Sequence, residues 1–296
     1  MRYRPFGATG KAVSAVSLLM RETPNMATPQ LWRALAFSAM ESGINSFEVT
    51  AGLDVMALGV GEALRAVERR LIFLSWRLRG DPHRPLTAEA VSNSVKAGLQ
   101  KTGAGYFDLL MLDDAAYESL EPSAHGYIAD LRAAGLVLQL GVTGDGAATQ
   151  ACIATGDFDV LATPFNLTSD WQARRRIREA SAANMTIVAT DPFPSALRLP
   201  TTQAQKGGGV FRRNDNPLAG AGTYAFLHET PGWSSEELCL AYVLTEPSFA
   251  SVQLEAFRAD TIDRLAAVTD RDLPTGVAAQ IEMARFSTDT DGRRRA

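Results

Sequence analysis

The sequence predicts an α/β protein made of one (β/α)8 barrel with an N-terminal β-hairpin. Short apolar runs alternate with amphipathic segments along the 296 residues, and eight of these runs have the length of strands. Apolar strands separated by helices are typical of a parallel sheet that helices cover on its outer face. Eight such units, in a chain near the usual barrel size of about 250 residues, favour a closed barrel over an open sheet.

A hairpin is expected first, within residues 2–13, because Gly7-Ala8-Thr9-Gly10 reads as a turn between two short extended pieces. This hairpin could plug one end of the barrel. The expected strands are residues 15–19, 45–49, 71–75, 107–112, 138–142, 160–164, 186–189 and 251–254. The expected helices include residues 29–42, 88–102, 127–134, 147–154, 170–183 and 234–244, with N-caps at Thr87, Asp170 and Ser234. The barrel should span residues 1–286, with residues 287–296 as a flexible polar tail.

Composition and charge exclude several classes of function. The formal net charge of −4 leaves no electrostatic footprint for nucleic acid. No run of 18 apolar residues occurs, and the first residues lack the apolar core of a signal peptide, so neither a membrane span nor secretion is expected. Cys152 and Cys239 lie far apart in the sequence without a CxxC motif, which predicts a reducing, cytoplasmic location.

One long irregular stretch, residues 192–231, contains several prolines and the triplet Gly207-Gly208-Gly209. A loop of this length in a compact domain is usually functional or disordered. Since it follows the seventh expected strand, it should lie over the carboxyl end of the barrel, where barrel active sites are found. The glycine triplet neither follows a strand nor opens a helix, so a phosphate cradle is not expected there.

Several stretches carry a family resemblance. They are YRPFGATG at residues 3–10, ESGINSF at 41–47, GYFDLLML at 105–112, LRAAG at 131–135 leading to GVT at 141–143, and the segment 234–244. In this order and spacing they resemble the aldo/keto reductase family over nearly the whole chain. The resemblance implies a (β/α)8 barrel and an NADP-dependent oxidoreductase. Because a fold does not carry function with it, the site has to be read residue by residue.

The resemblance implies a tetrad in which tyrosine donates a proton, lysine lowers its pKa, aspartate pairs with lysine and histidine orients the substrate. In this chain the four positions are occupied by Leu53, Trp76, Glu48 and Asp113 respectively. Leucine has no proton to donate, and losing a general acid costs about 10²–10⁴ in rate. Arg77 could substitute for the missing lysine beside Glu48, while Trp76 could stack a ligand or fill the space of an absent cofactor.

The positions that the resemblance assigns to the cofactor have changed as well. They are Thr143, Gly144, Ala162, Asn166, Thr190, Glu255, Arg258, Thr261 and Leu265. Thr190 stands where an aromatic ring should stack on nicotinamide. The Glu255 carboxylate, within about 4 Å of a phosphate, would repel it by about 4 kcal/mol at an effective dielectric of 20, and Arg258 would offset part of this repulsion. We therefore expect that NADP does not bind and that the protein uses no cofactor.

Four carboxylates, Glu48, Asp113, Asp191 and Glu255, close expected strands two, four, seven and eight and should converge at the barrel mouth. One hypothesis is a site for a divalent cation or a polyamine, because hard cations prefer oxygen ligands. A carboxylate acid/base pair is another. The interpretation we favour is that these groups are solvated or paired with arginines, the candidates being Arg21, Arg77, Arg79 and Arg258.

Three functions from different classes remain open at this point. The preferred one is a binding or regulatory module without NADPH-dependent reductase activity. The second is an enzyme with cofactor-independent chemistry at the acidic mouth, and the third is a divergent aldo/keto reductase that still binds NADP. The expected partner is a small molecule or a protein, rather than nucleic acid or membrane, and the oligomeric state is left open.

Overall fold

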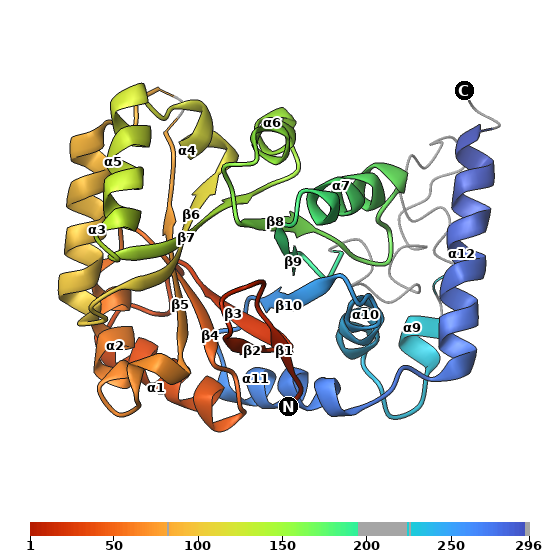
Figure 1. Ribbon diagram of the computed structural model, residues 1–296. Coiled ribbons are helices and arrows are strands. Elements are labelled where there is room, and N and C mark those ends of the chain that lie inside the picture. The colour runs from red at the N-terminus through yellow and green to blue at the C-terminus, as the bar shows by residue number, and fades with distance from the viewer. Residues whose placement is uncertain (82, 195–223, 225, 294–296) are drawn as a thin grey trace, which may run out of the picture.

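Eight apolar strands close into a parallel barrel in the computed structural model, which describes residues 1–81, 83–194, 224 and 226–293 (Figure 1). Around the barrel the strand order is β10-β3-β4-β5-β6-β7-β8-β9, and β9 pairs with β10 to close it. The strands are β3 (Val16–Met20), β4 (Ser46–Thr50), β5 (Phe73–Leu78), β6 (Phe107–Asp113), β7 (Val137–Thr143), β8 (Val160–Pro164), β9 (Thr186–Thr190) and β10 (Phe249–Leu254). The fold class predicted from the sequence is therefore confirmed.

The predicted N-terminal hairpin is present as two antiparallel strands, β1 (Tyr3–Pro5) and β2 (Ala12–Ser14). The turn between them uses Gly7 and Gly10, both in the left-handed region that glycine adopts without steric cost. Phe6, in the same turn, is 2% exposed and packs against Phe73 of the barrel interior, with the ring centroids 4.2 Å apart. The hairpin thus covers the amino-terminal end of the barrel, which leaves the carboxyl end for a site.

Charged groups fasten the hairpin to the barrel. Asp108 of β6 is 2% exposed and accepts hydrogen bonds from Arg69 Nη2 at 2.8 Å and from the Leu74 backbone N–H at 2.9 Å. Lys11 Nζ, from the hairpin, contacts the other oxygen of the same carboxylate. A buried carboxylate with two cationic partners is stable only while both partners remain, so this cluster ties the hairpin to β5 and β6.

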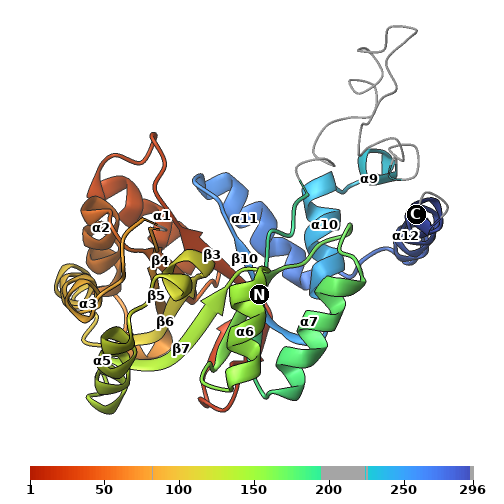
Figure 2. The same cartoon turned by 90° about the horizontal axis from the view of Figure 1, so that it is seen from above.

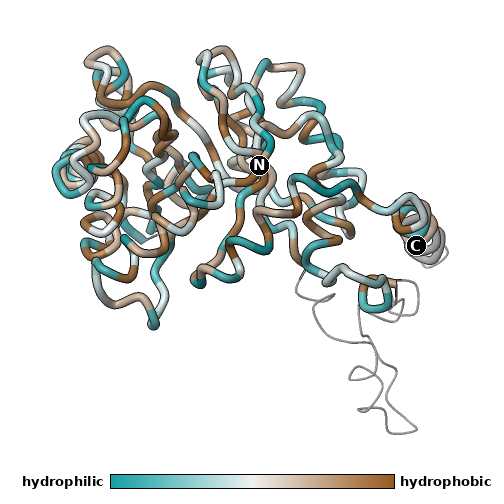
Figure 3. Tube along the Cα trace, turned by 90° about the horizontal axis from the view of Figure 1, so that it is seen from below, coloured by the Kyte–Doolittle hydropathy of each residue, from teal (hydrophilic) through white to brown (hydrophobic). Residues whose placement is uncertain are grey.

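Helices alternate with the strands and form the outer layer (Figures 1 and 2), and hydrophilic and hydrophobic residues alternate along their turns in Figure 3. They are α1 (Pro29–Glu41), α2 (Asp54–Leu64), α3 (Ala88–Thr102), α4 (Asp114–Glu118), α5 (Pro122–Ala133), α6 (Ala147–Thr155), α7 (Trp171–Ala182), α9 (Phe226–Glu229), α10 (Ser235–Leu244), α11 (Ala259–Ala267) and α12 (Thr275–Arg293). Short 3-10 turns lie at Arg69–Leu71 and Val268–Asp270. The predicted N-caps are confirmed, because Thr87, Asp170 and Ser234 each accept a backbone N–H at a helix start.

Helix α2 was not predicted, and two glycines explain why it packs where it does. A Cβ at Gly59 would lie 2.3 Å from the Pro29 carbonyl oxygen, and one at Gly61 would lie 2.5 Å from the Lys101 carbonyl oxygen. Glycine therefore lets α2 approach both α1 and α3 at backbone distance. Since the helix is buried on more than one side, its sequence lacks the polar stripe by which an amphipathic helix is recognised.

Helix α12 lies beside α9, on the side of α10 away from the barrel (Figures 1 and 2). It runs to Arg293, so regular helix continues into the segment 287–296 that was expected to be a flexible tail. Most of the stretch 192–231, including Gly207-Gly208-Gly209, lies outside the described residues. The expectation that this loop lies over the carboxyl end of the barrel therefore also concerns residues outside the described part. Among the described residues no helix is long and apolar enough to cross a membrane.

Candidate functional site

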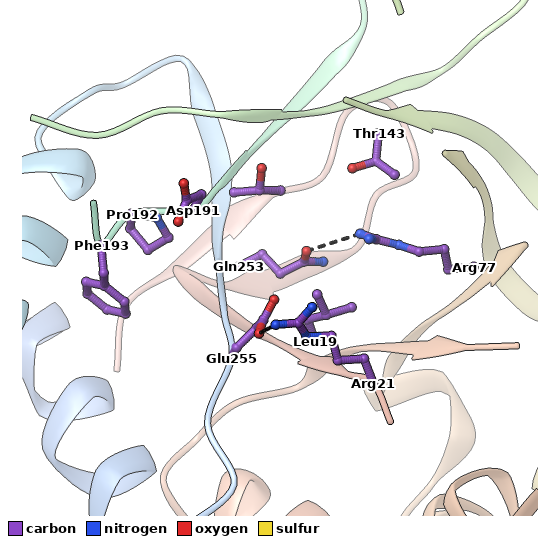
Figure 4. A pocket seen from close by; sticks show the side chains of 10 residues that line it. Leu19, Arg21, Arg77, Thr143, Asp191, Pro192, Phe193, Gln253 and Glu255 are labelled. Carbon is purple, nitrogen blue, oxygen red and sulfur yellow. Dashed lines mark hydrogen bonds and ion pairs between the residues drawn. The ribbon is translucent and has the colours of Figure 1, made fainter. Parts of the chain in front are cut away.

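Two adjoining pockets open at the carboxyl ends of the strands, and Arg21 and Arg77 line both. The first, the Gln253 pocket, has a volume of about 330 Å³ (Figure 4). Its lining residues are Leu19, Arg21, Arg77, Thr143, Thr190, Asp191, Pro192, Phe193, Gln253 and Glu255. The second, the Arg79 pocket, measures about 480 Å³ and is lined by Arg21, Glu22, Thr23, Pro24, Thr50, Arg77, Arg79 and Asp113. Both are at the end of the barrel where active sites are usually built.

An ion pair between Glu48 of β4 and Arg77 of β5 lies between the pockets and the barrel interior. Arg77 Nη2 contacts Glu48 Oε1. The same nitrogen donates a hydrogen bond of 3.3 Å to Gln253 Oε1. A dashed line marks this hydrogen bond in Figure 4. The Glu48 contact has the distance of an ion pair but not the geometry of a hydrogen bond. Glu48 Oε1 therefore has no hydrogen-bond partner among the described residues, and Arg77 Nε has none either. Glu48 also lines a void of about 20 Å³ in the barrel interior, together with apolar side chains such as Phe73 and small polar ones such as Ser75.

Trp76 does not face the mouth, and the expectation that it stands in the site is wrong. Its ring stacks on Phe107 with centroids 5.2 Å apart and planes at 16°, and its Nε1 donates to Ser94 Oγ of α3 at 3.1 Å. Side chains alternate along a strand, so Trp76 points to the helical layer while Ser75 and Arg77 point inward. The side chain that reaches the mouth beside Glu48 is therefore Arg77.

The other two tetrad positions hold side chains with structural partners. Leu53 immediately precedes α2 and packs, partly buried, against the main hydrophobic core. Asp113 ends β6 and caps α4, where its Oδ1 accepts the backbone N–H groups of Gly80 at 3.1 Å and Ala116 at 2.7 Å. Asp113 lines the Arg79 pocket, whereas Glu48 lines the interior void, and no hydrogen bond among the described residues joins these positions.

The positions that the resemblance assigns to a cofactor are dispersed. Ala162 is fully buried in the barrel interior, and Leu265 is 1% exposed. Thr143 and Thr190 line the Gln253 pocket. Asn166 binds the backbone just after β9, because its Nδ2 donates a hydrogen bond of 3.0 Å to the Asp191 carbonyl. Asp191 has a positive φ of 48° at this point.

The charged residues near the expected phosphate position form ion pairs with other side chains of the protein. Glu255 forms an ion pair of 2.6 Å with Arg21 (Figure 4). Arg258 donates two hydrogen bonds to Asp260, at 3.0 and 2.6 Å, and this exposed pair lowers the pKa of the Asp260 carboxyl to about 2. Thr261 donates its backbone N–H to the same carboxylate. The start of α11 is thus occupied by its own side chains.

The four predicted carboxylates do not meet in one cavity. Glu48 lines the interior void, Asp113 lines the Arg79 pocket, and Asp191 and Glu255 line the Gln253 pocket. Within the described ranges no group of three or more His, Cys, Asp or Glu side chains could hold a metal ion. The hypothesis of a shared cation site is therefore not supported. Two of the four arginines considered as counter-charges, Arg21 and Arg77, do pair with rim carboxylates.

Several mouth residues were missed in the sequence, among them Phe193 and Thr50. Phe193 follows β9 by three residues and lines the Gln253 pocket, although only 7% of its surface is exposed. Thr50 ends β4 and lines the Arg79 pocket. Thr50 could have been found by counting two residues on from Glu48, which faces inward. Phe193 lies at the start of the irregular stretch, where no periodicity indicates a direction.

The family model of the Aldo/keto reductase family matches residues 55–285. The match begins after Glu48 and Leu53 and includes Arg77, Asp113 and Glu255. A search of curated proteins found no match to the chain.

Proposed function

We propose that this chain, which belongs to the aldo/keto reductase family, is a binding or regulatory module without NADPH-dependent reductase activity. The observation that carries the proposal is the lining of the two pockets at the mouth. Among the described residues, neither pocket contains a tyrosine, histidine or lysine. A reductase has to deliver a proton to the carbonyl oxygen as hydride arrives, and these are the side chains that usually donate it at neutral pH.

The mouth also fits a nicotinamide cofactor poorly. Thr190 offers no ring for stacking, and the nearby Phe193 is too buried to present its face. Ala162 has no amide to hold the carboxamide and lies sealed in the interior. Glu255 also engages Arg21 in an ion pair, so this pair is neutral overall and offers a phosphate no net attraction.

The ion pair between Glu48 and Arg77 supports a role in binding rather than in proton transfer. The two side chains contact each other as a buried ion pair, and the arginine guanidinium stays charged at all accessible pH values. The pair therefore presents fixed charge to the mouth. Ligand recognition needs fixed groups of this kind, held by packing and by further polar contacts such as that to Gln253.

Fluorescence or calorimetric titration with NADPH near physiological salt tests the proposal, together with an assay for reduction of a generic aldehyde. We expect neither saturable binding nor turnover. The variant Glu255→Gln is the informative companion, because it removes the carboxylate near the phosphate position while keeping the shape of the side chain. A low-micromolar dissociation constant for the native protein, or measurable turnover, would overturn the proposal in favour of a divergent reductase.

The divergent reductase is the second candidate, and the family match is the observation that favours it. An enzyme with cofactor-independent chemistry has less support. Its acid and base would be Glu48 and Asp113, but Glu48 is paired with Arg77 and Asp113 accepts two backbone N–H groups. Both carboxylates are therefore already engaged by groups of the protein itself.

A further inference from the structure

We propose that the Arg79 pocket binds a small molecule through an oxyanion group, a carboxylate or a phosphate, held by Arg77 and Arg79. This inference rests on the proposed function, because it names the ligand class for the mouth of a protein that does not use NADPH. The pocket has a volume of about 480 Å³, which is within the size range of small-molecule sites.

Arg79 carries a guanidinium that pairs with no carboxylate among the described residues. It follows β5 by one residue, on the same side of the chain as Arg77, and it is exposed at the mouth. The other arginines considered for the mouth have partners: Arg21 pairs with Glu255 and Arg258 pairs with Asp260. The Arg79 side chain makes no ion pair or hydrogen bond with the described part of the chain. Its five N–H donors are therefore available to a ligand in a planar arrangement that suits an oxyanion.

Arg77 adds a second, more rigid set of donors. Its Nη2 is used by Glu48 and Gln253, and its Nε is buried without a partner. Its Nη1 has no hydrogen bond to described residues and is not among the buried atoms, so it remains accessible from the pockets. The side chain is 16% exposed and is held by Glu48 from below. A guanidinium that is fixed before the ligand arrives loses little entropy on binding, which favours affinity.

Two carboxylates also line the Arg79 pocket, and they determine where an anion can sit. Asp113 Oδ1 accepts two backbone N–H groups, so part of its negative charge is balanced locally. Glu22 is exposed and has no ion pair with a described residue. An oxyanion would bind on the β5 side of the pocket, next to Arg77 and Arg79, while Glu22 would weaken its binding by repulsion.

This arrangement makes opposite predictions for the two charged groups on the rim. Charge-assisted hydrogen bonds from arginine to an oxyanion are stronger than neutral ones, so Arg79→Gln should weaken binding at least tenfold. Glu22→Gln should tighten it severalfold. A pocket that selects cations would respond with the opposite sign to both substitutions. The matched control is Arg65→Gln, which removes an exposed arginine at the end of α2, where the chain turns toward the amino-terminal face of the barrel.

The experiment is calorimetric titration of the native protein and the three variants with malonate and, separately, with inorganic phosphate. We expect saturable binding of at least one probe, weaker in Arg79→Gln, tighter in Glu22→Gln and unchanged in Arg65→Gln. The two probes distinguish a carboxylate from a phosphate ligand. Absence of binding by both, equal constants in Arg79→Gln, or binding of spermidine that Glu22→Gln weakens would overturn the inference. NADPH binding by the native protein would refute the proposed function separately, since the effect of Arg79→Gln on malonate and phosphate would still be measured.

Discussion

Arg77 and Glu48 form an ion pair at the centre of the barrel mouth, where the side chains are 16% and 4% exposed respectively. Two charges at such depth lose most of their hydration, and the loss is compensated only while each has the other. Glu48 stands at the position where the family resemblance implies an aspartate, and Arg77 lies one residue beyond Trp76, where the resemblance implies a lysine. β4 thus keeps a negative side chain and β5 a positive one. The side chains differ from aspartate and lysine in size and in hydrogen-bonding capacity.

Removal of one partner of this pair should destabilise the fold strongly. Arg77→Met leaves the Glu48 carboxylate buried without its counter-charge, and such losses lower the free energy of unfolding by about 3–5 kcal/mol. Replacing both residues, as Glu48→Leu with Arg77→Met, should restore much of the stability because no uncompensated charge remains. Urea denaturation of the single and double variants measures this. If the two single losses simply add in the double variant, the residues do not act as a pair.

A similar argument applies at the opposite end of the barrel. Asp108→Asn removes the carboxylate that Lys11 and Arg69 share, so we expect a loss of about 3 kcal/mol or more in the free energy of unfolding. The control is Asp260→Asn, whose exposed pair with Arg258 should contribute nothing measurable. Thermal and chemical unfolding provide the readout. An Asp108→Asn protein as stable as the control would show that the hairpin is held by packing alone.

The apolar runs in the sequence located the strands, but they did not show which side chains of each strand face the barrel interior. The eight strands were recognised as apolar runs, yet β5 is buried on both faces, so Phe73–Leu78 shows no regular alternation of polar and apolar residues. Whether Trp76 or Arg77 pointed inward could not be decided from the sequence, and a shift of one residue exchanges the two faces of a strand. Helix α2 escaped prediction for the same reason, since burial on several sides removes its polar stripe.

The positions of the mouth carboxylates could be predicted, but their partners could not. Asp113 and Glu255 lie at strand ends because parallel strands share one carboxyl edge, whereas Glu48, which was expected to close its strand, lies in the middle of β4 and lines the interior void. Their partners depend on side-chain reach across strands that are distant in sequence. Glu255 pairs with Arg21, more than two hundred positions earlier, while Arg258 pairs with Asp260 two residues away. Only tertiary distances can distinguish these outcomes.

Restoring the tetrad should not restore reduction of an aldehyde. The four substitutions at the positions that the structure indicates are Glu48→Asp, Leu53→Tyr, Arg77→Lys and Asp113→His. Acid chemistry without a bound hydride donor gives no reduction, and the cofactor positions remain unsuited to NADPH. A lysine placed at Trp76 would be buried beneath α3, so Trp76→Lys should fail to fold. This variant is the control that Arg77, and not Trp76, faces the mouth. Turnover by the quadruple variant would show that the cofactor site is intact.

Cys152 of α6 should be unreactive in the folded protein and should make stability depend on pH in the alkaline range. The residue is fully buried, and burial raises the pKa of its thiol from 9.0 to about 12. Below pH 9 both folded and unfolded chains keep the proton, so the thiol has no effect on the pH dependence there. Between pH 9 and about 12 the unfolded chain loses the proton while the folded one retains it, so stability falls as the pH rises.

Urea unfolding at pH 8, 9.5 and 10.5 should therefore show a steeper decline in the free energy of unfolding for the native protein than for Cys152→Ala. Iodoacetamide at pH 8.5, with the labelled site located by mass spectrometry, should modify Cys152 only after unfolding. Equal slopes for the two proteins, or rapid labelling of this residue in the native state, would contradict a buried, protonated thiol.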